Sequence, residues 1–339
     1  MQEYVENLYF YIHLNVFSWG RLSGSRYNLT TLGLSEKTAI DILKSERFAE
    51  CVLITKFNKP VTSYALQRSR LFAQIKKQQL LWIEAEDSLP RAHFSEHGNA
   101  ELRAMKRQWM HYHARRSEGI LSLMPCTYDL AMRVANVGNR AKFKKHGIHK
   151  GSLCRIRAWT LHEEDEALLE TSKESEICLK HLPLCLFVEV IGGLKEQVDG
   201  LPKDWFPLVP STSVWSLDKD ENIEIERKGF PLVPDFSSTI HVATGRTLES
   251  EISDLGGFED RPSHRSAMEA YIALSRATDA EGVLITRPFS PTLFRQKAQP
   301  FPTYLLELLT SGKDLDLSKC ERIQKEMDAG KKKTRPCYS

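Results

Sequence analysis

The sequence predicts an α/β protein in which a parallel-sheet domain is interrupted by a small β-rich, barrel-like insert. A short apolar and β-branched run, Cys51–Phe57, precedes a polar loop and a helical pattern, the order of a parallel α/β unit. Residues 123–235 instead hold short strand-like runs separated by Pro, Gly and acidic turns. Strand, loop and helix return over residues 236–310. We therefore assign residues 49–122 and 236–310 to the sheet domain and 123–235 to the insert.

Composition is that of an ordinary globular protein. The chain has 339 residues, 41% hydrophobic and 27% charged, which is enough for one or two cores. A formal charge of +3 permits a nucleic-acid partner without requiring one. Seven scattered cysteines without a C-x-x-C pair favour neither a zinc site nor a disulfide framework, and they indicate a reducing, intracellular compartment. The apolar run Leu8–Phe17 is too short to span a bilayer, so no membrane partner is expected.

The first elements follow from local patterns. Residues 1–48 resemble the middle of a protein more than a domain start, and we expect them to be the end of a missing upstream domain. Cys51–Phe57 predicts a buried strand that ends at Asn58. The helix behind it is expected to carry Arg68 and Arg70 on its polar side.

Two polar segments leave alternatives open. Residues 86–116 are rich in histidine and arginine, which fits a solvated helix face or a surface that follows phosphates. The acidic run Glu163–Glu166 resembles a magnesium site at a strand end, but a solvated turn is the expected structure because adjacent carboxylates repel. Strands of the insert are expected at Leu153–Leu161, Ile177–Val190, Val214–Leu217 and Ile223–Ile225.

The most informative segment is 235–294. A strand-like run ends near Thr239 and is followed by a loop with Gly245. Ser263 then begins a helix that ends before Ser275 and Arg276, and a strand starts at Gly282. Two strand-to-loop junctions are therefore expected to bring polar groups together, and parallel sheets bind ligands at the carboxyl ends of their strands.

These stretches resemble known helicase motifs. TIHVATGRTLE, Thr239–Glu249, resembles motif V of superfamily I helicases. Ala270–Phe289 resembles their motif VI, with Tyr271, Ala273, Leu274, Ser275 and Arg276 in matching order. Over residues 50–300 the chain is thus similar to the C-terminal RecA-like domain, a P-loop NTPase fold, of a superfamily I DNA helicase of the RecD and PIF type, with its UvrD-like C-terminal region.

The resemblance implies roles for individual residues. Arg276 is implied to meet the charge that develops on the γ-phosphate of ATP, with Gly245 and Ser275 beside the nucleotide. Contacts with the nucleic-acid strand are implied for Asn58, Thr239, His241 and Thr247. The chain departs from the family at Val242 and Thr244, where a polar or basic residue and a glutamine are usual, and Arg246 follows the glycine.

A phosphate loop is absent from the sequence. The Gly-Lys pairs Gly312-Lys313 and Gly330-Lys331 lack the upstream glycine and the following hydroxyl of G-x-x-x-x-G-K-[ST]. ATP and Mg²⁺ are therefore expected to bind only together with a missing N-terminal motor domain.

The expected function is the C-terminal motor half of an ATP-dependent DNA helicase, a fragment that does not hydrolyse ATP alone. Its partners would be single-stranded DNA, or RNA, and the upstream helicase domain. The alternative is a non-catalytic nucleic-acid-binding or interaction module. Residues 311–339 form a charged tail with Lys331–Lys333, which leaves nucleus, cytoplasm and organelle open.

Overall fold

The chain forms two compact units, residues 1–257 with 272–288, and residues 258–271 with 289–339. The computed structural model describes residues 15–16, 32–33, 41–88, 114, 116–138, 141–218, 223–255, 264–286, 289, 293, 300–312 and 314–333. Most of the predicted N-terminal segment and most of the basic stretch 86–116 lie outside these residues.

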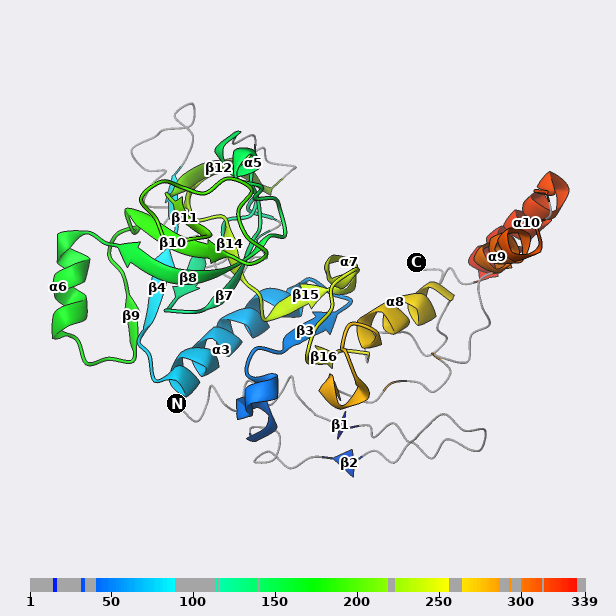
Figure 1. Ribbon diagram of the computed structural model, residues 1–339, viewed down its shortest axis with the longest axis horizontal. Coiled ribbons are helices and arrows are strands. Elements are labelled where there is room, and N and C mark those ends of the chain that lie inside the picture. The colour runs from blue at the N-terminus through cyan, green and yellow to red at the C-terminus, as the bar shows by residue number, and fades with distance from the viewer. Residues whose placement is uncertain are drawn as a thin grey trace. The chain divides into compact units, whose positions relative to one another are not determined.

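The sheet domain of the first unit is built on parallel strands (Figure 1). Its six strands lie in the order β15 (Ser237–Thr239), β3 (Val52–Thr55), β16 (Glu251–Ser253), β17 (Val283–Ile285), β1 (Asn15–Val16) and β2 (Leu32–Gly33). The first four are parallel, and β1 and β2 add antiparallel pairs. All side chains of β3 are buried, as expected for a central parallel strand covered on both faces.

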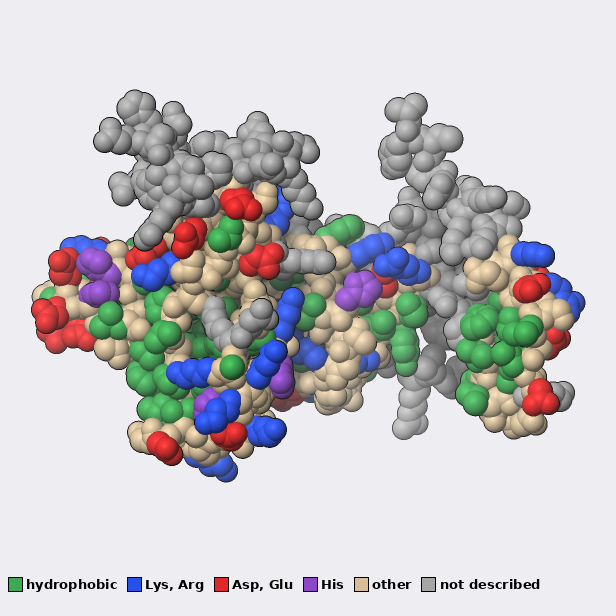
Figure 2. All heavy atoms as spheres, turned by 90° about the horizontal axis from the view of Figure 1, so that it is seen from above, with side chains coloured by type: hydrophobic (Ala, Val, Ile, Leu, Met, Phe, Trp, Pro, Cys, Tyr) green, Lys and Arg blue, Asp and Glu red, His purple; other side chains and the backbone are tan. Residues whose placement is uncertain are grey.

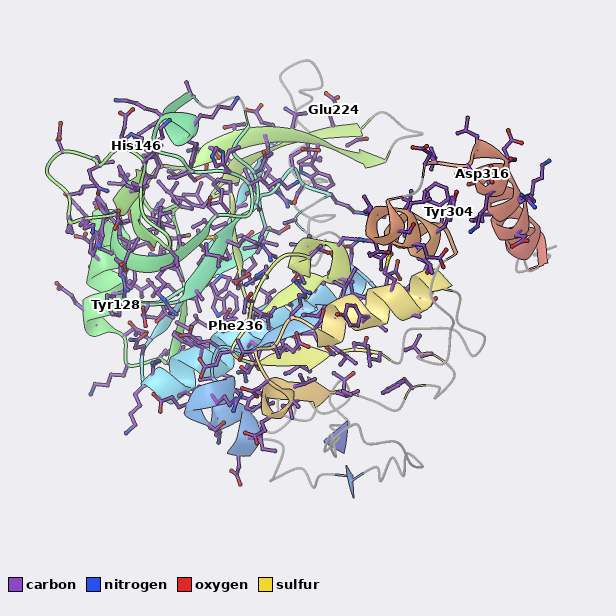
Figure 3. All side chains as sticks on the ribbon, turned by 45° about the vertical axis from the view of Figure 1, so that its right-hand side comes forward. Tyr128, His146, Glu224, Phe236, Tyr304 and Asp316 are labelled. Carbon is purple, nitrogen blue, oxygen red and sulfur yellow. The ribbon has the colours of Figure 1, made fainter. Side chains whose placement is uncertain are left out.

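Helix α3 (Lys59–Lys76) follows β3 and joins the sheet to the rest of the core. Pro60 lies in its first turn, where a missing N–H costs little, and the helix ends at Lys77 in a left-handed conformation. On its buried face the ring of Phe72 packs 5.9 Å from that of Phe236, which is labelled in Figure 3. Both rings belong to one apolar cluster that includes residues of the sheet and of the insert.

The insert is built from three further sheets. One has the order β11 (Trp205–Leu208), β10 (Cys185–Val190), β8 (Leu153–Thr160), β7 (Ala131–Val134) and β14 (Leu232–Pro234). The others are β12 (Ser211–Asp218), β13 (Ile223–Gly229) and β5 (Glu86–Ser88), and β6 (Leu123–Cys126), β4 (Leu80–Glu84) and β9 (Glu176–Cys178). The predicted fold class, a parallel α/β sheet interrupted by a β-rich insert, is confirmed. The hydrogen-bonded strands of the insert begin with β4, upstream of residue 123, where the sequence predicted the insert to start.

The acidic run is not a turn. Glu163–Glu166 begins helix α6 (Glu163–Thr171), where acidic side chains suit the positive end of the helix dipole. Asp165 is buried and accepts hydrogen bonds from the backbone N–H groups of Lys180 (2.8 Å) and His181 (3.1 Å). These bonds hold the turn that divides the predicted strand Ile177–Val190 into β9 and β10.

Arg68 is not on a polar side of its helix. Its side chain is 1% exposed and donates to the carbonyl oxygens of Phe48 (2.7 Å) and Ala49 (2.9 Å). Those carbonyls lie at the end of the short 3-10 helix η1 (Glu46–Phe48), where backbone acceptors are no longer paired within the helix. Arg70, by contrast, is partly exposed and pairs with Glu176.

Replacing Arg68 with methionine is expected to lower the free energy of unfolding by about 2–3 kcal/mol, because buried carbonyls lose charge-assisted hydrogen bonds. The matched Arg70→Met change should cost about 1 kcal/mol or less, since its ion pair is partly solvated. Urea unfolding followed by circular dichroism measures both. Equal losses for the two variants would contradict the role given to Arg68.

The second unit is helical in the residues described. Helix α8 (His264–Leu274) begins in it, and α9 (Pro300–Ser311) and α10 (Leu317–Lys333) follow. The hydroxyl of Tyr304 accepts from the backbone N–H of Asp316 at 3.0 Å, which joins α9 to the start of α10 (Figure 3). Within the part of the chain that the structure describes, no helix is long and apolar enough to cross a membrane.

Candidate functional site

The carboxyl edge of the parallel sheet brings three predicted site residues together. Thr239 ends β15, and its register partner on β3 is Thr55. Helix α7 (Ile240–Ala243) follows Thr239 and carries His241, while Asn58 precedes α3 at the end of β3. The side chains of His241 and Asn58 are exposed. Polar groups therefore flank two neighbouring strand ends.

Asp254 is a further residue of this edge that sequence reasoning missed. It follows β16, and its carboxylate accepts from the hydroxyls of Thr55 (3.2 Å) and Thr286 (3.3 Å). The two threonines end β3 and follow β17, so one carboxylate joins three adjacent strands. The sequence signal for it was weak, since Asp254 follows the short and largely polar strand Glu251–Ser253.

Two exposed apolar side chains lie on the same edge. Phe57 is 48% exposed after β3, and Val242 is 50% exposed on α7. Single exposed apolar residues are common on protein surfaces. Here they follow strands that are paired in register, beside Asn58 and His241, and an aromatic face in a polar rim can stack on a nucleic-acid base.

The remaining predicted residues lie in the loop after α7 and directly after α8. Gly245 has a φ of +82°, which glycine adopts easily, and it turns the chain after α7. Leu248 and Ala277 then form a parallel bridge that precedes both β16 and β17. Arg276 and its neighbours therefore lie toward the amino ends of these strands. The expectation that both junctions meet at carboxyl ends is wrong, because Arg276 precedes its strand and does not follow it.

Arg276 is held by neutral acceptors. Its Nε donates to the carbonyl of Ile272 (2.9 Å), Nη1 to the carbonyl of Arg246 (3.2 Å) and Nη2 to Oγ of Ser275 (2.7 Å). Among the residues that the structure describes, no Asp or Glu forms an ion pair with it. An arginine keeps its charge at every physiological pH, so within the described residues this site presents a fixed cation without an ion-pair partner.

Glu251, a buried carboxyl group whose pKa the charge of Arg276 lowers, forms no ion pair with this arginine. It is fully buried at the start of β16, its Oε1 accepts from the hydroxyl of Ser253 (3.2 Å), and its Oε2 has no hydrogen-bond partner. Burial raises the pKa of Glu251 to about 8, although the Ser253 hydrogen bond and the charge of Arg276 oppose this rise. Burial therefore favours the protonated, uncharged form of Glu251.

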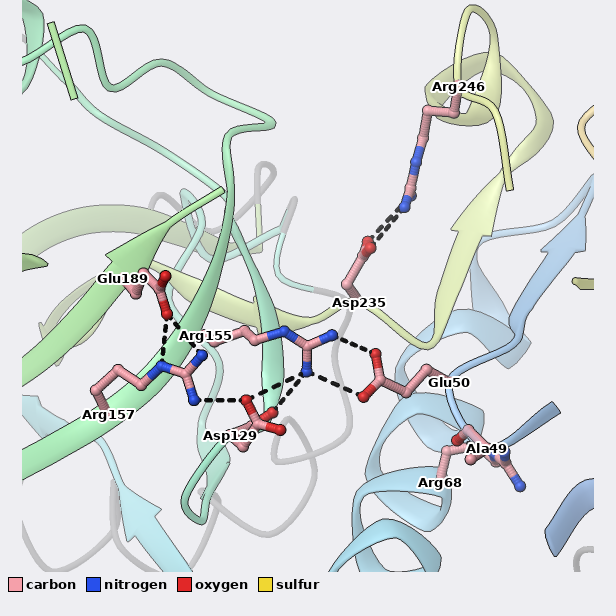
Figure 4. Close-up of polar contacts among 9 residues, drawn as sticks. All are labelled: Ala49, Glu50, Arg68, Asp129, Arg155, Arg157, Glu189, Asp235 and Arg246. Atoms are coloured by element: carbon pink, nitrogen blue, oxygen red, sulfur yellow. Dashed lines mark hydrogen bonds and ion pairs between the residues drawn. The ribbon is translucent and has the colours of Figure 1, made fainter. Parts of the chain in front are cut away.

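Arg246, in the loop after α7, already has a carboxylate partner. Arg246 donates to both carboxylate oxygens of Asp235, at 3.0 and 2.6 Å (Figure 4). Arg133 of β7 shares the same carboxylate at 3.1 Å. One acidic group thus serves two arginines, and with Arg276 this part of the molecule carries an excess of positive charge. Such an excess suits a phosphate-bearing ligand.

Magnesium ligands do not accompany these arginines. In the described parts of the chain, no three His, Cys, Asp or Glu side chains are arranged to hold a metal ion.

Comparison with known proteins gives a distant likeness. No family model and no curated protein matches the chain. Solved structures of Pif1 helicases do. The enzyme from Candida albicans has a TM-score of 0.46 and 14% identity over 83% of this chain and 55% of that one. Pif1 from Bacteroides bound to ssDNA has 0.43 and 14% over 78% and 48%, and its complex with ADP-AlF3 and ssDNA has 0.43 and 13% over 79% and 47%.

The chain spans about half the length of these structures.

Proposed function

We propose that this chain acts as the second motor domain of a superfamily I helicase, contributing Arg276 to a nucleotide and a sheet edge to single-stranded DNA. The observation that supports the proposal best is the state of Arg276: a permanent cation, fixed by neutral acceptors and without a carboxylate partner among the described residues. A developing charge on a phosphate is what such a group stabilises.

The nucleotide would be shared between domains. Arg276 donates to Ser275 and to the carbonyl of Arg246, and the exposed Gly245, which precedes Arg246, would let a phosphate approach closely. The phosphate loop and Mg²⁺ would come from another domain, in the same or a second polypeptide. This chain alone is therefore expected to show negligible ATP turnover.

The single-stranded DNA would lie along the carboxyl edge of the sheet. Asn58, Thr239 and His241 offer polar contacts to sugar and phosphate, and Phe57 offers a face for stacking. Thr247 lies in the loop of Arg246, away from this edge, and is exposed. We therefore assign Thr247 to the nucleotide side, with a smaller share in strand binding than the carboxyl edge.

Fluorescence anisotropy with single-stranded DNA tests this division. The double change Phe57→Ala with His241→Ala should raise Kd about tenfold or more, since stacking on one base contributes about 1–3 kcal/mol. The control is Arg276→Ala, which removes a positive charge outside the carboxyl edge. It should change Kd less than about twofold when both variants are compared at the same ionic strength. If Arg276→Ala weakened binding as much as the double change, the separation of the two surfaces would be disproved.

A second candidate function has its own supporting observation. Helix α5 (Ala141–Lys145) and the turn after it expose several cations of the insert, and Figure 2 shows basic side chains gathered on this face. The exposed residues are Lys142, Lys144, Lys145, His149 and Lys150. This surface would suit a non-catalytic nucleic-acid-binding module. A triple Lys142, Lys144 and Lys145→Glu variant that abolished binding, with the carboxyl edge intact, would favour that alternative.

A further inference from the structure

We infer that Asp235 is a positioning residue for Arg276, acting through Arg246 and linking the arginine to the insert. This inference rests on the proposed function only for the role of Arg276. The geometry that supports it is independent of any ligand.

The first contact in this connection is a buried ion pair. Asp235 is 8% exposed and Arg246 17%, and both oxygens of the carboxylate accept from the guanidinium. Two parallel charge-assisted bonds fix the orientation of both groups. Shielding from water keeps the attraction strong, so the side chain of Arg246 has one preferred position.

The second contact passes through the backbone of the same residue. The carbonyl of Arg246 accepts from Nη1 of Arg276, and its N–H donates to the carbonyl of Ala243 at 3.1 Å. Gly245, with its positive φ, sets the direction of this peptide. Because Arg276 has only neutral acceptors, its place depends on where this carbonyl is held.

The third contact reaches the insert. Arg133 of β7 donates to Asp235 and also to the carbonyl of Ser237 in β15, at 3.3 Å. Asp235 itself lies where β14 of the insert leads into β15 of the sheet. A displacement of β7 against the sheet would therefore act on Asp235, then on Arg246, and so on Arg276.

The chain offers a matched control in Asp129. This carboxylate also lies between two arginines, accepting from Arg157 (2.7 Å) and pairing with Arg155 (3.5 Å), as Figure 4 shows. It belongs to the insert, and among the residues that the structure describes it has no hydrogen bond or ion pair with the loop that carries Arg246. Asp129→Asn should thus disturb an equivalent ion pair without reaching Arg276.

Modification by phenylglyoxal, read for each arginine by peptide mass spectrometry, tests the inference on the full chain without nucleotide or DNA. Asp235→Asn should speed modification of Arg276 about tenfold, because the loop that holds it opens more often. Asp129→Asn should leave that rate within about twofold of the original. Hydrogen exchange at Leu248 and Thr278, whose N–H groups donate to Arg276 and Leu248 carbonyls, should rise only in Asp235→Asn.

A double-variant cycle separates positioning from general weakening. Arg246→Met should reproduce the effect of Asp235→Asn, and the two together should add little, because they remove one connection. Arg246→Lys, which keeps the charge but loses the fork, should give an intermediate rate and serves if Arg246→Met folds poorly. An unchanged Arg276 rate in Asp235→Asn, or equal acceleration in Asp129→Asn, would overturn the inference. Absence of DNA binding by the unmodified chain would count against the proposed function and leave this result standing.

Discussion

Replacing Arg227 with methionine is expected to lower the free energy of unfolding of the first unit by about 3–5 kcal/mol. Arg227 of β13 and Asp87 of β5 are 0% and 1% exposed, and they form two hydrogen bonds, of 2.6 and 2.8 Å. The guanidinium also lies 5.0 Å from the ring centre of Trp215. Removing the cation takes an ion pair and two hydrogen bonds from a buried carboxylate, which costs more than the pair contributes.

Urea unfolding followed by tryptophan fluorescence measures this loss. The neighbouring Lys228→Met is the control, because Lys228 forms an exposed ion pair with Glu86 between the same two strands. Its removal should cost about 0.5 kcal/mol or less. A double change of Arg227→Met with Asp87→Leu should recover part of the loss, since no charge then stays buried. Equal losses for Arg227→Met and Lys228→Met would contradict this explanation.

Glu251 is expected to make stability fall as the pH rises. The folded chain keeps its proton up to a pKa of about 8, whereas the unfolded chain releases it near the ordinary value of 4.5. Between these values the folded state binds more protons, so a rising pH favours unfolding. The contribution of this group amounts to on the order of 3–5 kcal/mol across the window, and it levels off above pH 8.

Thermal or urea unfolding at pH 5 to 8.5 measures how steeply the free energy of unfolding falls with pH. Glu251→Gln cannot ionise, so the variant should lose most of the slope and be more stable than the original chain at pH 8.5. Glu249→Gln, at an exposed neighbouring position, should keep it. A slope that survives in Glu251→Gln would mean that other groups cause it.

Local patterns predicted much of the fold, because β3, α3, α8 and β17 follow from residues close in sequence. They could not predict which charged residues become buried. Arg68 and Asp165 look like surface residues, and only distant backbone groups, at Phe48 and at Lys180, show why they are inside.

The candidate site, too, contains residues that the sequence singled out and residues that it did not. Arg276 and Ser275 belong to one continuous motif, so the sequence was sufficient to single them out. Asp235 and Asp254 were missed because their partners, Arg246 and the threonines of β3 and β17, come from separate segments. The path of the loop after α7 depends on the lengths and pairing of the strands, and a sequence motif does not specify these.

Photocross-linking of a single-stranded oligonucleotide that carries 5-iodouracil tests the central claim most directly. After irradiation, peptide mass spectrometry identifies the residues attached to the strand. The proposed second motor domain predicts cross-links at the carboxyl edge, at Phe57 and His241, lost in the Phe57→Ala with His241→Ala variant. Cross-links confined to the lysines of α5, or none at all under low salt, would contradict a strand-binding edge on this sheet.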